Sequence, residues 1–329
     1  MAAAQTPSHW QELVSSFLAD ARRPLIVILG PTASGKTLFS IAAAHFLSER
    51  SHGTWRGAEV INADSRQLYR GLDIGTAKIT AEEQQGIPHH LLSVLDPDEE
   101  AAAGWYRTRA AAAIASIREV GRIPLLVGGS MLYVSAVMDG LTLAPVPNTA
   151  LRECLFKEYE RDAGVTLYRR LMEIDPESAG KIHPRNKPHL IRAVEIYELL
   201  GEPKSKSIPT SQLRSGKKDE QNMCTNSEHD LLILGVKLPQ HVLDQRINER
   251  VQRMFSDGWI SEVQSLLAAG YGADAPAMKS HGYREIIAFL TAGEPASLDA
   301  LQESIASRTR RYARGQMKWW KHDPRIQWV

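Results

Sequence analysis

Apolar residues along the chain follow two patterns, short apolar runs and longer stretches with helical spacing. The short runs occupy residues 25–29, 59–63, 123–127 and 231–236. Such runs are typical of parallel strands that are buried on both faces. Stretches at 38–50 and 101–121, rich in alanine, separate the first three runs and predict helices. This alternation predicts an α/β fold with a parallel sheet in its core.

The pattern changes after the Pro-Val-Pro segment at residues 145–147. Helical spacing without strands follows at residues 151–162, 167–174 and 188–200. Residues 201–230 are polar and predict a linker. The run at 231–236 needs a sheet to join, and the N-terminal sheet is the nearest. We therefore expect an all-helical insertion in a discontinuous core. The predicted divisions are an N-terminal extension, a first core part, the insertion with its linker, and a second core part, at residues 1–23, 24–143, 144–230 and 231–329.

The N-terminal extension predicts a short surface helix, because Val14, Phe17 and Leu18 lie near one helical face. A mitochondrial presequence is the alternative. Glu12 and Asp20 count against it, since such segments are poor in acidic residues.

Composition places the chain among ordinary globular proteins, with 43% hydrophobic and 23% charged residues in 329. The two cysteines, Cys154 and Cys224, have neither disulfide-framework nor zinc-site spacing. No apolar stretch approaches the roughly 20 residues of a membrane span. We expect a cytoplasmic protein, a monomer, with no membrane partner.

A phosphate-binding loop follows the first apolar run and matches G-x-x-x-x-G-K-[ST]. Its residues are Gly30, Pro31, Thr32, Ala33, Ser34, Gly35, Lys36 and Thr37. The glycines let successive backbone N–H groups point inward, Lys36 adds a positive charge, and Thr37 is a ligand for Mg²⁺. The preceding strand and following helix fit this motif, which predicts a P-loop NTPase-like core that binds a diphosphate.

The carboxylate usual in ATP-using P-loop enzymes is missing from the strand at 123–127. Such enzymes end a second buried strand with an Asp that helps hold Mg²⁺, whereas here Gly128, Gly129 and Ser130 follow. We interpret the glycines as allowing close approach of a substrate. Asp64, after the neighbouring strand, should face the ligand crevice; a turn or helix-cap role is the alternative.

The C-terminal segment carries a local positive charge. Residues 301–329 hold seven Lys or Arg and two Asp or Glu. Four of the basic residues share one helical face, with aromatic residues interleaved: Arg310, Arg314, Lys318 and Lys321, with Tyr312, Trp319 and Trp320. Such a surface suits phosphates and unstacked bases. A solvated basic helix whose aromatics pack inward is the alternative.

Several motifs together resemble the tRNA dimethylallyltransferase family, also called tRNA isopentenyltransferases. They are the phosphate loop, D-S-R-Q-L-Y-R-G-L-D-I-G-T-A-K at 64–78, P-H-H-L-L at 88–92, G-R-I-P-L-L-V-G-G-S-M-L-Y at 121–133, I-H-P-R-N at 182–186, L-D-Q-R-I-N-E-R-V at 243–251, H-G-Y-R-E at 281–285 and T-R-R-Y-A from 309 with Gln316 and Trp319. The motif at 64–78 is highly specific, whereas the phosphate loop alone is not.

The resemblance implies transfer of a dimethylallyl group from its diphosphate to N6 of the adenosine just 3′ of the anticodon. It implies Mg²⁺ as cofactor, the anticodon stem-loop of tRNA as partner, and a flipped-out target base. The implied catalytic residues are Thr32 near the bridging oxygen and Arg250 on the diphosphate, with Asp64 as general base. The implied tRNA-binding residues are Asp64, Ser65, Arg66, Gln67, Ser130, Arg152, His189 and Arg192.

Three arginines, Arg246, Arg250 and Arg253, are spaced i, i+4 and i+7 beside an apolar stripe. Without the resemblance each of them also fits a solvated helix face. Two positions depart from the family pattern. His189 stands where the family commonly has Arg, so this contact is weaker or depends on pH. Gly315 replaces a usual Arg, which puts one charge near the site in doubt.

Three other functions stay open on the sequence. A small-molecule kinase would share the core and a helical lid, but the missing Asp after residue 127 argues against ATP turnover. A non-catalytic RNA-binding P-loop protein would not need Asp64 in the crevice. Prenylation of free adenine nucleotides is close in chemistry, and the insertion and basic C-terminus favour tRNA over it.

Overall fold

The computed structural model describes residues 8–49, 54–139, 148–207, 228–292 and 297–329. Its six strands form one parallel sheet in the order β3-β2-β4-β1-β5-β6. In that order the strands are His89–His90, Ala58–Asn62, Ile123–Gly128, Pro24–Leu29, Asp230–Gly235 and Ile326–Trp328. The expectation that the run at 231–236 joins the N-terminal sheet is confirmed, because β5 pairs with β1 along its whole length.

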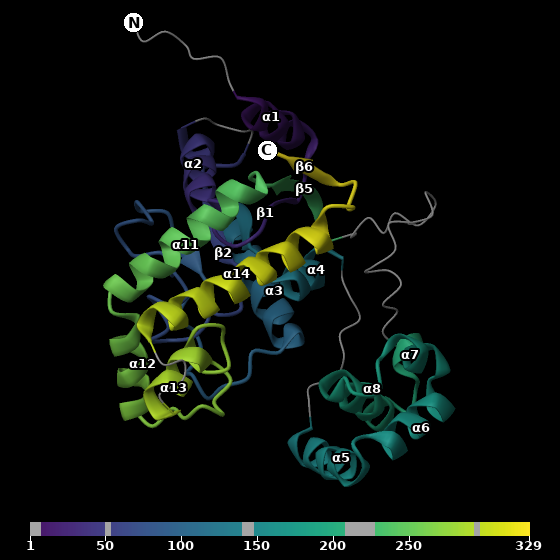
Figure 1. Ribbon diagram of the computed structural model, residues 1–329. Coiled ribbons are helices and arrows are strands. Elements are labelled where there is room, and N and C mark those ends of the chain that lie inside the picture. The colour runs from purple at the N-terminus through teal and green to yellow at the C-terminus, as the bar shows by residue number, and fades with distance from the viewer. Residues whose placement is uncertain (1–7, 50–53, 140–147, 208–227, 293–296) are drawn as a thin grey trace, which may run out of the picture. The chain divides into compact units, whose positions relative to one another are not determined.

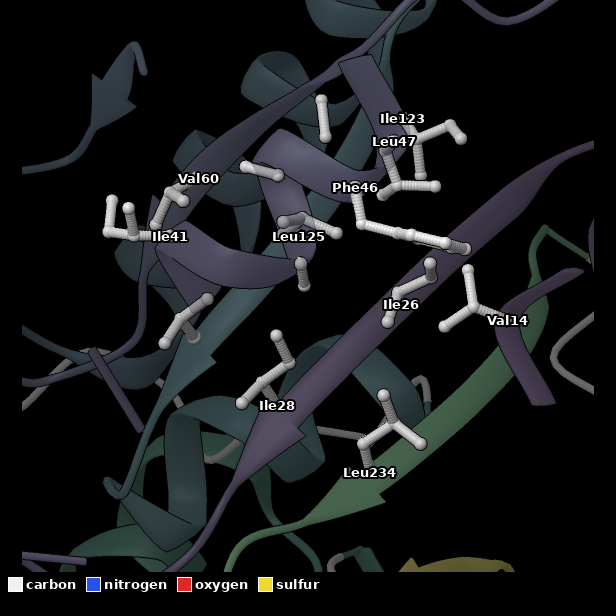
Figure 2. Close-up of a cluster of buried hydrophobic side chains, with 14 of the residues drawn as sticks. Val14, Ile26, Ile28, Ile41, Phe46, Leu47, Val60, Ile123, Leu125 and Leu234 are labelled. Atoms are coloured by element: carbon white, nitrogen blue, oxygen red, sulfur yellow. The ribbon is translucent and has the colours of Figure 1, made fainter. Parts of the chain in front are cut away.

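The central strands are apolar because the sheet is covered on both faces. Every residue of β1 and β4 is buried. Figure 2 shows Ile26 and Ile28 of β1, Leu125 of β4 and Leu234 of β5 pointing into one apolar cluster. Phe46 belongs to the same cluster and comes from α2, which spans Lys36–Glu49.

The sequence pattern missed two strands, β3 and β6. Each is at most three residues long, and each lies at one edge of the sheet. Three residues carry too little periodicity to predict a strand. Strand β6 exists because Ile326 and its neighbours pair with β5.

The remaining helices of the sheet-containing unit are α1, α3, α4 and α11–α14 (Figure 1). They span His9–Asp20, Ala103–Glu119, Met131–Met138, Gln240–Ser256, Trp259–Ala268, Tyr283–Ala292 and Leu298–Trp320. The predicted N-terminal helix is present, and its Val14 packs in the sheet cluster. Helices α11 and α14 pack against each other, so residues far apart in sequence meet at one place.

A second compact unit contains the described helices α5–α9. They span Thr149–Asp162, Val165–Ile174, Pro176–Lys181, Lys187–Leu200 and Lys204–Ser207. Its core contains Leu155, Leu167, Leu171 and Leu190. The predicted helices are confirmed to within about two residues, α7 and α9 were not predicted, and most of the predicted linker, like Cys224, lies outside the described residues. Within the described chain, no helix is both long and apolar enough to span a membrane.

Candidate active site

The phosphate loop begins where β1 ends, and its backbone needs glycine. Gly30 has φ +153°, and a Cβ there would lie 2.3 Å from the carbonyl oxygen of Val236. Gly35 and Ala33 also have positive φ, 96° and 63°. These conformations turn the loop into the first residue of α2, Lys36. The hydroxyl of Ser34 is buried without a hydrogen-bond partner.

The Lys36 ammonium is held inside this loop, where it donates a 2.7 Å hydrogen bond to the carbonyl oxygen of Pro31. Burial, together with the nearby charge of Arg250, lowers the pKa of Lys36 to about 8, while Asp64 opposes the shift. Within the described residues, Lys36 and Arg250 bond to a carbonyl oxygen and a hydroxyl and form no ion pair, so the site holds positive charge that no carboxylate contacts directly. An anion bound in the loop would supply the missing balance.

Arg250 reaches the loop from α11, whose apolar stripe of Leu243, Ile247 and Val251 is buried. Its Nη1 donates to the hydroxyl of Thr32 at 3.2 Å. Burial lowers the pKa of Arg250, with Asp64 again opposing.

Arg246 and Arg253, one turn to either side of Arg250, differ from it. The Arg246 side chain also lies by the loop, with Nη1 3.7 Å from where a Cβ of Gly35 would be. Arg253 is exposed. The helix therefore brings two of its three arginines to the loop.

Asp64 follows β2 at the same edge of the sheet as the loop. Its backbone N–H donates to the side chain of Asn62, and its Oδ1 accepts the backbone N–H of Arg66 at 2.9 Å. These bonds fix the carboxylate in a tight turn. Its charge acts on both Lys36 and Arg250, so three of the residues predicted for the site lie together.

Ser65 and Ser130 join the turn after Asp64 to the end of β4. The Ser65 backbone N–H donates to the Ser130 hydroxyl at 2.8 Å, and that hydroxyl donates to the hydroxyl of Ser65 at 3.1 Å. Tyr312 of α14 completes the group. Burial and the charge of Asp64 raise the pKa of Tyr312 to about 12, and interactions with the side chains of Ser130 and Gln316 oppose the shift. The sequence suggested this tyrosine as a base-stacking residue and gave no sign of its place beside Ser130.

Gly128, the last residue of β4, and Gly129, the next residue, allow the protein to pack on itself, a reason for glycine that the sequence did not suggest. A Cβ on Gly128 would lie 2.2 Å from the carbonyl oxygen of Ala63. A Cβ on Gly129 would lie 2.3 Å from the amide nitrogen of Gln316. Any side chain at either position, including the Asp of an ATP-using enzyme, would clash.

The motif at 64–78 is held by contacts that the sequence did not reveal. The side-chain amide nitrogen of Gln67 donates hydrogen bonds to the carbonyl oxygens of Thr76 and Ala77. The Glu262 carboxylate of α12 accepts the backbone N–H groups of three successive residues, at distances from 2.7 to 3.2 Å; they are Asp73, Ile74 and Gly75. Arg66, by contrast, is exposed, with one long contact to the carbonyl oxygen of Pro276 at 3.5 Å.

An aromatic ring explains two more glycines. A Cβ on either Gly75 or Gly282 would lie 2.0 Å from the Trp259 indole. Tyr283, next to the second glycine, donates to Glu262 at 2.6 Å. Glu262 and Trp259 are 180 or more residues away from residues 73–75 in sequence, so no local signal predicts these contacts.

In the helical unit, two of the predicted tRNA-binding arginines pair with one fully buried carboxylate. Arg152 Nε lies 3.0 Å from Glu195 Oε2, and Arg192 Nη1 lies 2.5 Å from the same oxygen. The side chains of the two arginines are 36% and 21% exposed. His189 is exposed and contacts Asn186 at 3.0 Å.

The basic C-terminal helix is partly neutralised. Arg310 contacts Glu303 and Asn248, and Arg314 lies 3.9 Å from Asp244. The Trp320 ring is 2% exposed, so it packs inward and is not available for stacking on a base. Lys318 is exposed. The alternative of aromatic residues that pack inward therefore holds for Trp320, and binding of phosphates by the exposed basic residues stays a prediction.

Thr37 is the predicted metal ligand, and its side chain is exposed in the first turn of α2. Among the described residues, no three His, Cys, Asp or Glu side chains gather into a metal site. That arrangement fits Mg²⁺ held jointly by a hydroxyl and substrate phosphates, because Mg²⁺ keeps several waters and seldom uses an all-protein cage.

Comparison with known proteins agrees with this geometry. The IPP transferase family profile matches residues 67–323. A tRNA dimethylallyltransferase of Geobacter sulfurreducens is 37% identical over 94% of this chain and 93% of its own. One of Symbiobacterium thermophilum is 39% identical over 93% and 89%.

Solved structures extend the similarity to the fold. The tRNA isopentenylpyrophosphate transferase of Bacillus halodurans aligns with a TM-score of 0.64 and 34% identity, over 94% of this chain and 90% of that chain. A eukaryotic dimethylallyltransferase, in a crystallographic study of its action on tRNA, aligns with a TM-score of 0.70 and 28% identity, over 90% and 69%. With the P-loop, the parallel sheet and these matches together, the chain belongs to the IPP transferase family of tRNA dimethylallyltransferases.

Proposed function

We propose that this protein transfers a dimethylallyl group from dimethylallyl diphosphate to N6 of the adenosine immediately 3′ of the anticodon in tRNA. One observation carries the proposal: a cationic phosphate loop and one carboxylate, Asp64, share the same edge of the sheet. The loop suits a leaving diphosphate, and the carboxylate suits an amine that must lose a proton.

The donor half of the reaction uses the loop, Lys36 and Arg250. As the bond from C1 of the dimethylallyl group to the bridging oxygen breaks, its electron pair leaves with the diphosphate. Donors fixed in advance stabilise this charge without reorganising. Arg250 bonds to Thr32, and we infer that these two groups face the bridging oxygen.

Thr37 would hold Mg²⁺ in the proposed donor site. When bound, it would neutralise charge on the leaving group. Thr37 offers an exposed hydroxyl beside Lys36 for this purpose.

The acceptor half of the reaction uses Asp64. The exocyclic amine of adenine is a weak nucleophile because its lone pair is delocalised into the ring. As the N6–C1 bond forms, the amine proton passes to the Asp64 carboxylate, which the hydrogen bond from Arg66 holds in place. The products are N6-(dimethylallyl)adenosine and diphosphate.

We infer that tRNA contacts both units. Ser65, Arg66, Gln67 and Ser130 lie on the turn and strand end around Asp64, where a flipped adenine would enter. Arg152, His189 and Arg192 of the helical unit are partly or fully exposed and would contact the tRNA backbone. We further propose that the enzyme works as a cytoplasmic monomer.

A P-loop kinase is disfavoured by the packing at Gly128 and Gly129, which leaves no space for a metal-binding carboxylate there. Prenylation of free adenine nucleotides would use the same chemistry. Only the acceptor, a free nucleotide instead of tRNA, distinguishes it from the proposed reaction.

The test supplies Mg²⁺ and dimethylallyl diphosphate with either tRNA or AMP, where the tRNA has adenosine 3′ of the anticodon. Mass spectrometry of the digested RNA should show N6-(dimethylallyl)adenosine at that position. Product with AMP but none with tRNA would overturn the proposal. Turnover of ATP to ADP with a small-molecule acceptor would favour the kinase.

A further inference from the structure

Gln316 of α14 connects the phosphate loop to the end of β4. Its Oε1 accepts the backbone N–H of Thr32 at 2.8 Å, and its Nε2 donates to the carbonyl oxygen of Gly129 at 2.8 Å. The residue is 2% exposed. A buried amide with both ends occupied has one fixed orientation, because Thr32 can only donate and Gly129 can only accept.

The surroundings are built around this side chain. A Cβ on Gly129 would lie 2.3 Å from Nε2 of Gln316, so only glycine leaves room for the amide. Three residues earlier, Ala313 is buried with Leu243 and Ile247 of α11, and Ala33 packs against the same cluster. The helix is thus seated by apolar contacts that do not depend on Gln316.

Thr32 is held from two sides. Gln316 fixes its backbone, and Arg250 contacts its hydroxyl at 3.2 Å. Gly129, the other partner of Gln316, is directly followed by Ser130, which binds the turn after Asp64. One amide therefore links the loop that would bind the donor to the strand end that would hold the acceptor.

We propose that Gln316 is a positioning residue. It places the Thr32 hydroxyl beside the reacting end of the diphosphate and keeps it aligned with the strand end that would hold the acceptor. The proposal rests on the proposed function. Gln316 acts through Thr32 and Gly129 and does not itself touch the reacting atoms. A misplacement of about 1 Å can cost about 10²-fold in rate, so loss of the amide should lower kcat more than it weakens binding.

The first variant is Gln316→Met, which has a similar length and no hydrogen-bonding amide. We expect kcat to fall at least about tenfold, while the Kd for tRNA changes less than about threefold. Gln252→Met is the control, because Gln252 is exposed on α11 and its loss should leave kcat unchanged. Thermal unfolding of each variant checks that the comparison is made on folded protein.

A double-mutant cycle with Thr32→Val separates positioning from general support of the fold. If Gln316 acts by placing the Thr32 hydroxyl, loss of the amide should cost less in a protein that already lacks this hydroxyl. The fold-decrease in kcat of the double variant should then be smaller than the product of the two single decreases. Full multiplication of the two effects would overturn the proposal.

Gln316→Glu keeps the test decisive if the methionine variant does not fold. A protonated carboxyl group can make both bonds, whereas a carboxylate cannot donate to Gly129. The kcat of this variant relative to wild type should therefore fall as pH rises. A flat ratio, or a Gln316→Met variant with wild-type kcat, would overturn the proposal. Failure of the wild-type enzyme to modify tRNA would instead overturn the proposed function.

Discussion

The phosphate loop and the helical unit both contain partly buried cationic groups, and the surroundings of these groups differ. At the loop, the pKa values of Lys36 and Arg250 are lowered, mainly by burial, and the charge of the Asp64 carboxylate only partly offsets this lowering. In the helical unit, Arg152 and Arg192 share Glu195. Burial alone would raise the pKa of Glu195, but hydrogen bonds, led by that from Arg192, lower it.

Both regions have two cations for one carboxylate, and they differ in contact: in the part of the chain that the structure describes, Lys36 and Arg250 form no ion pair, whereas Arg152 and Arg192 both pair directly with Glu195. Buried positive charge without a direct ion pair costs stability until a ligand binds. The loop therefore has an electrostatic reason to take up a diphosphate. In the Glu195 cluster both arginines already contact the carboxylate, so we expect it first to hold α5 against α8, with any tRNA contact by its arginines added to that role.

The largest expected effect comes from removing the only acidic group that we propose for chemistry. Asp64→Asn keeps the size of the side chain and removes its ability to take a proton, so transfer should slow by about 10²–10⁴-fold. Single-turnover assays measure the rate, and filter binding measures tRNA affinity, which should stay largely intact. Asp98→Asn, at an exposed position of the same unit, is the control. Wild-type turnover of Asp64→Asn would exclude it as the base.

The next effect tests the other side of the comparison. Glu195→Gln leaves two guanidinium groups without their carboxylate. Breaking a buried pair costs about 3–5 kcal/mol, and partial exposure of both arginines reduces this to about 2 kcal/mol. Hydrogen exchange of α5–α8 peptides in urea would report the local loss. Glu198→Gln, on the same helix and paired with Arg170, should cost less than about 1 kcal/mol.

The same variant can break the comparison. If Arg152 and Arg192 serve mainly to bind tRNA, Glu195→Gln would leave exchange rates unchanged and alter the salt dependence of tRNA affinity. That outcome would make the cluster a recognition surface and not a structural one.

These two regions also show what the sequence could predict. The phosphate loop and the strands β1, β2, β4 and β5 follow from local pattern, because buried parallel strands and glycine turns are encoded by neighbouring residues. Glu262 could not be predicted, since its partners are backbone N–H groups of a distant loop. Nothing in the sequence singles out Glu195, because only the tertiary structure shows that it is buried.

Aromatic residues on α14 mark a second limit. Trp319 and Trp320 are adjacent in sequence, yet Trp320 is buried and Trp319 is partly exposed. Helical spacing tells which residues share a face, but not which face the rest of the protein covers. Tyr312 illustrates the same limit, because its contact with Ser130 depends on how α14 crosses the end of β4.

A smaller effect is expected from the three arginines of α11, whose contributions to diphosphate affinity should differ. Arg250→Ala should raise the Kd for inorganic diphosphate about 10- to 100-fold, because a hydrogen bond to a charged group is worth about 1.5–3 kcal/mol. Arg246→Ala, exposed beside Gly35, should cost less than about tenfold. Arg253→Ala should stay within about twofold. Isothermal titration with Mg²⁺ measures all three, and equal effects would mean that only the net charge of the helix matters.

The smallest effect is a pH dependence set by Lys36. Its pKa is lowered to about 8 in the free protein, first by burial, so the ammonium loses its proton as pH rises past that value. The Kd for dimethylallyl diphosphate should therefore be about tenfold higher at pH 9 than at pH 7. The unfolded lysine keeps its proton up to its ordinary pKa of 10.5. Between about 8 and 10.5 the unfolded state binds more protons, and this residue contributes increasing stability to the free protein as pH rises.

Calorimetry in buffers of different ionisation enthalpy tests the same lysine directly. Binding of the diphosphate at pH 9 should take up a proton, because the bound anion restores the charged form, and binding at pH 7 should take up almost none from this group. Lys36→Arg keeps its charge throughout, so its affinity, although lower, should be flat between pH 7 and 9. Proton uptake that persists in Lys36→Arg would assign the titration to another group and remove Lys36 from the contrast between this loop and the Glu195 cluster.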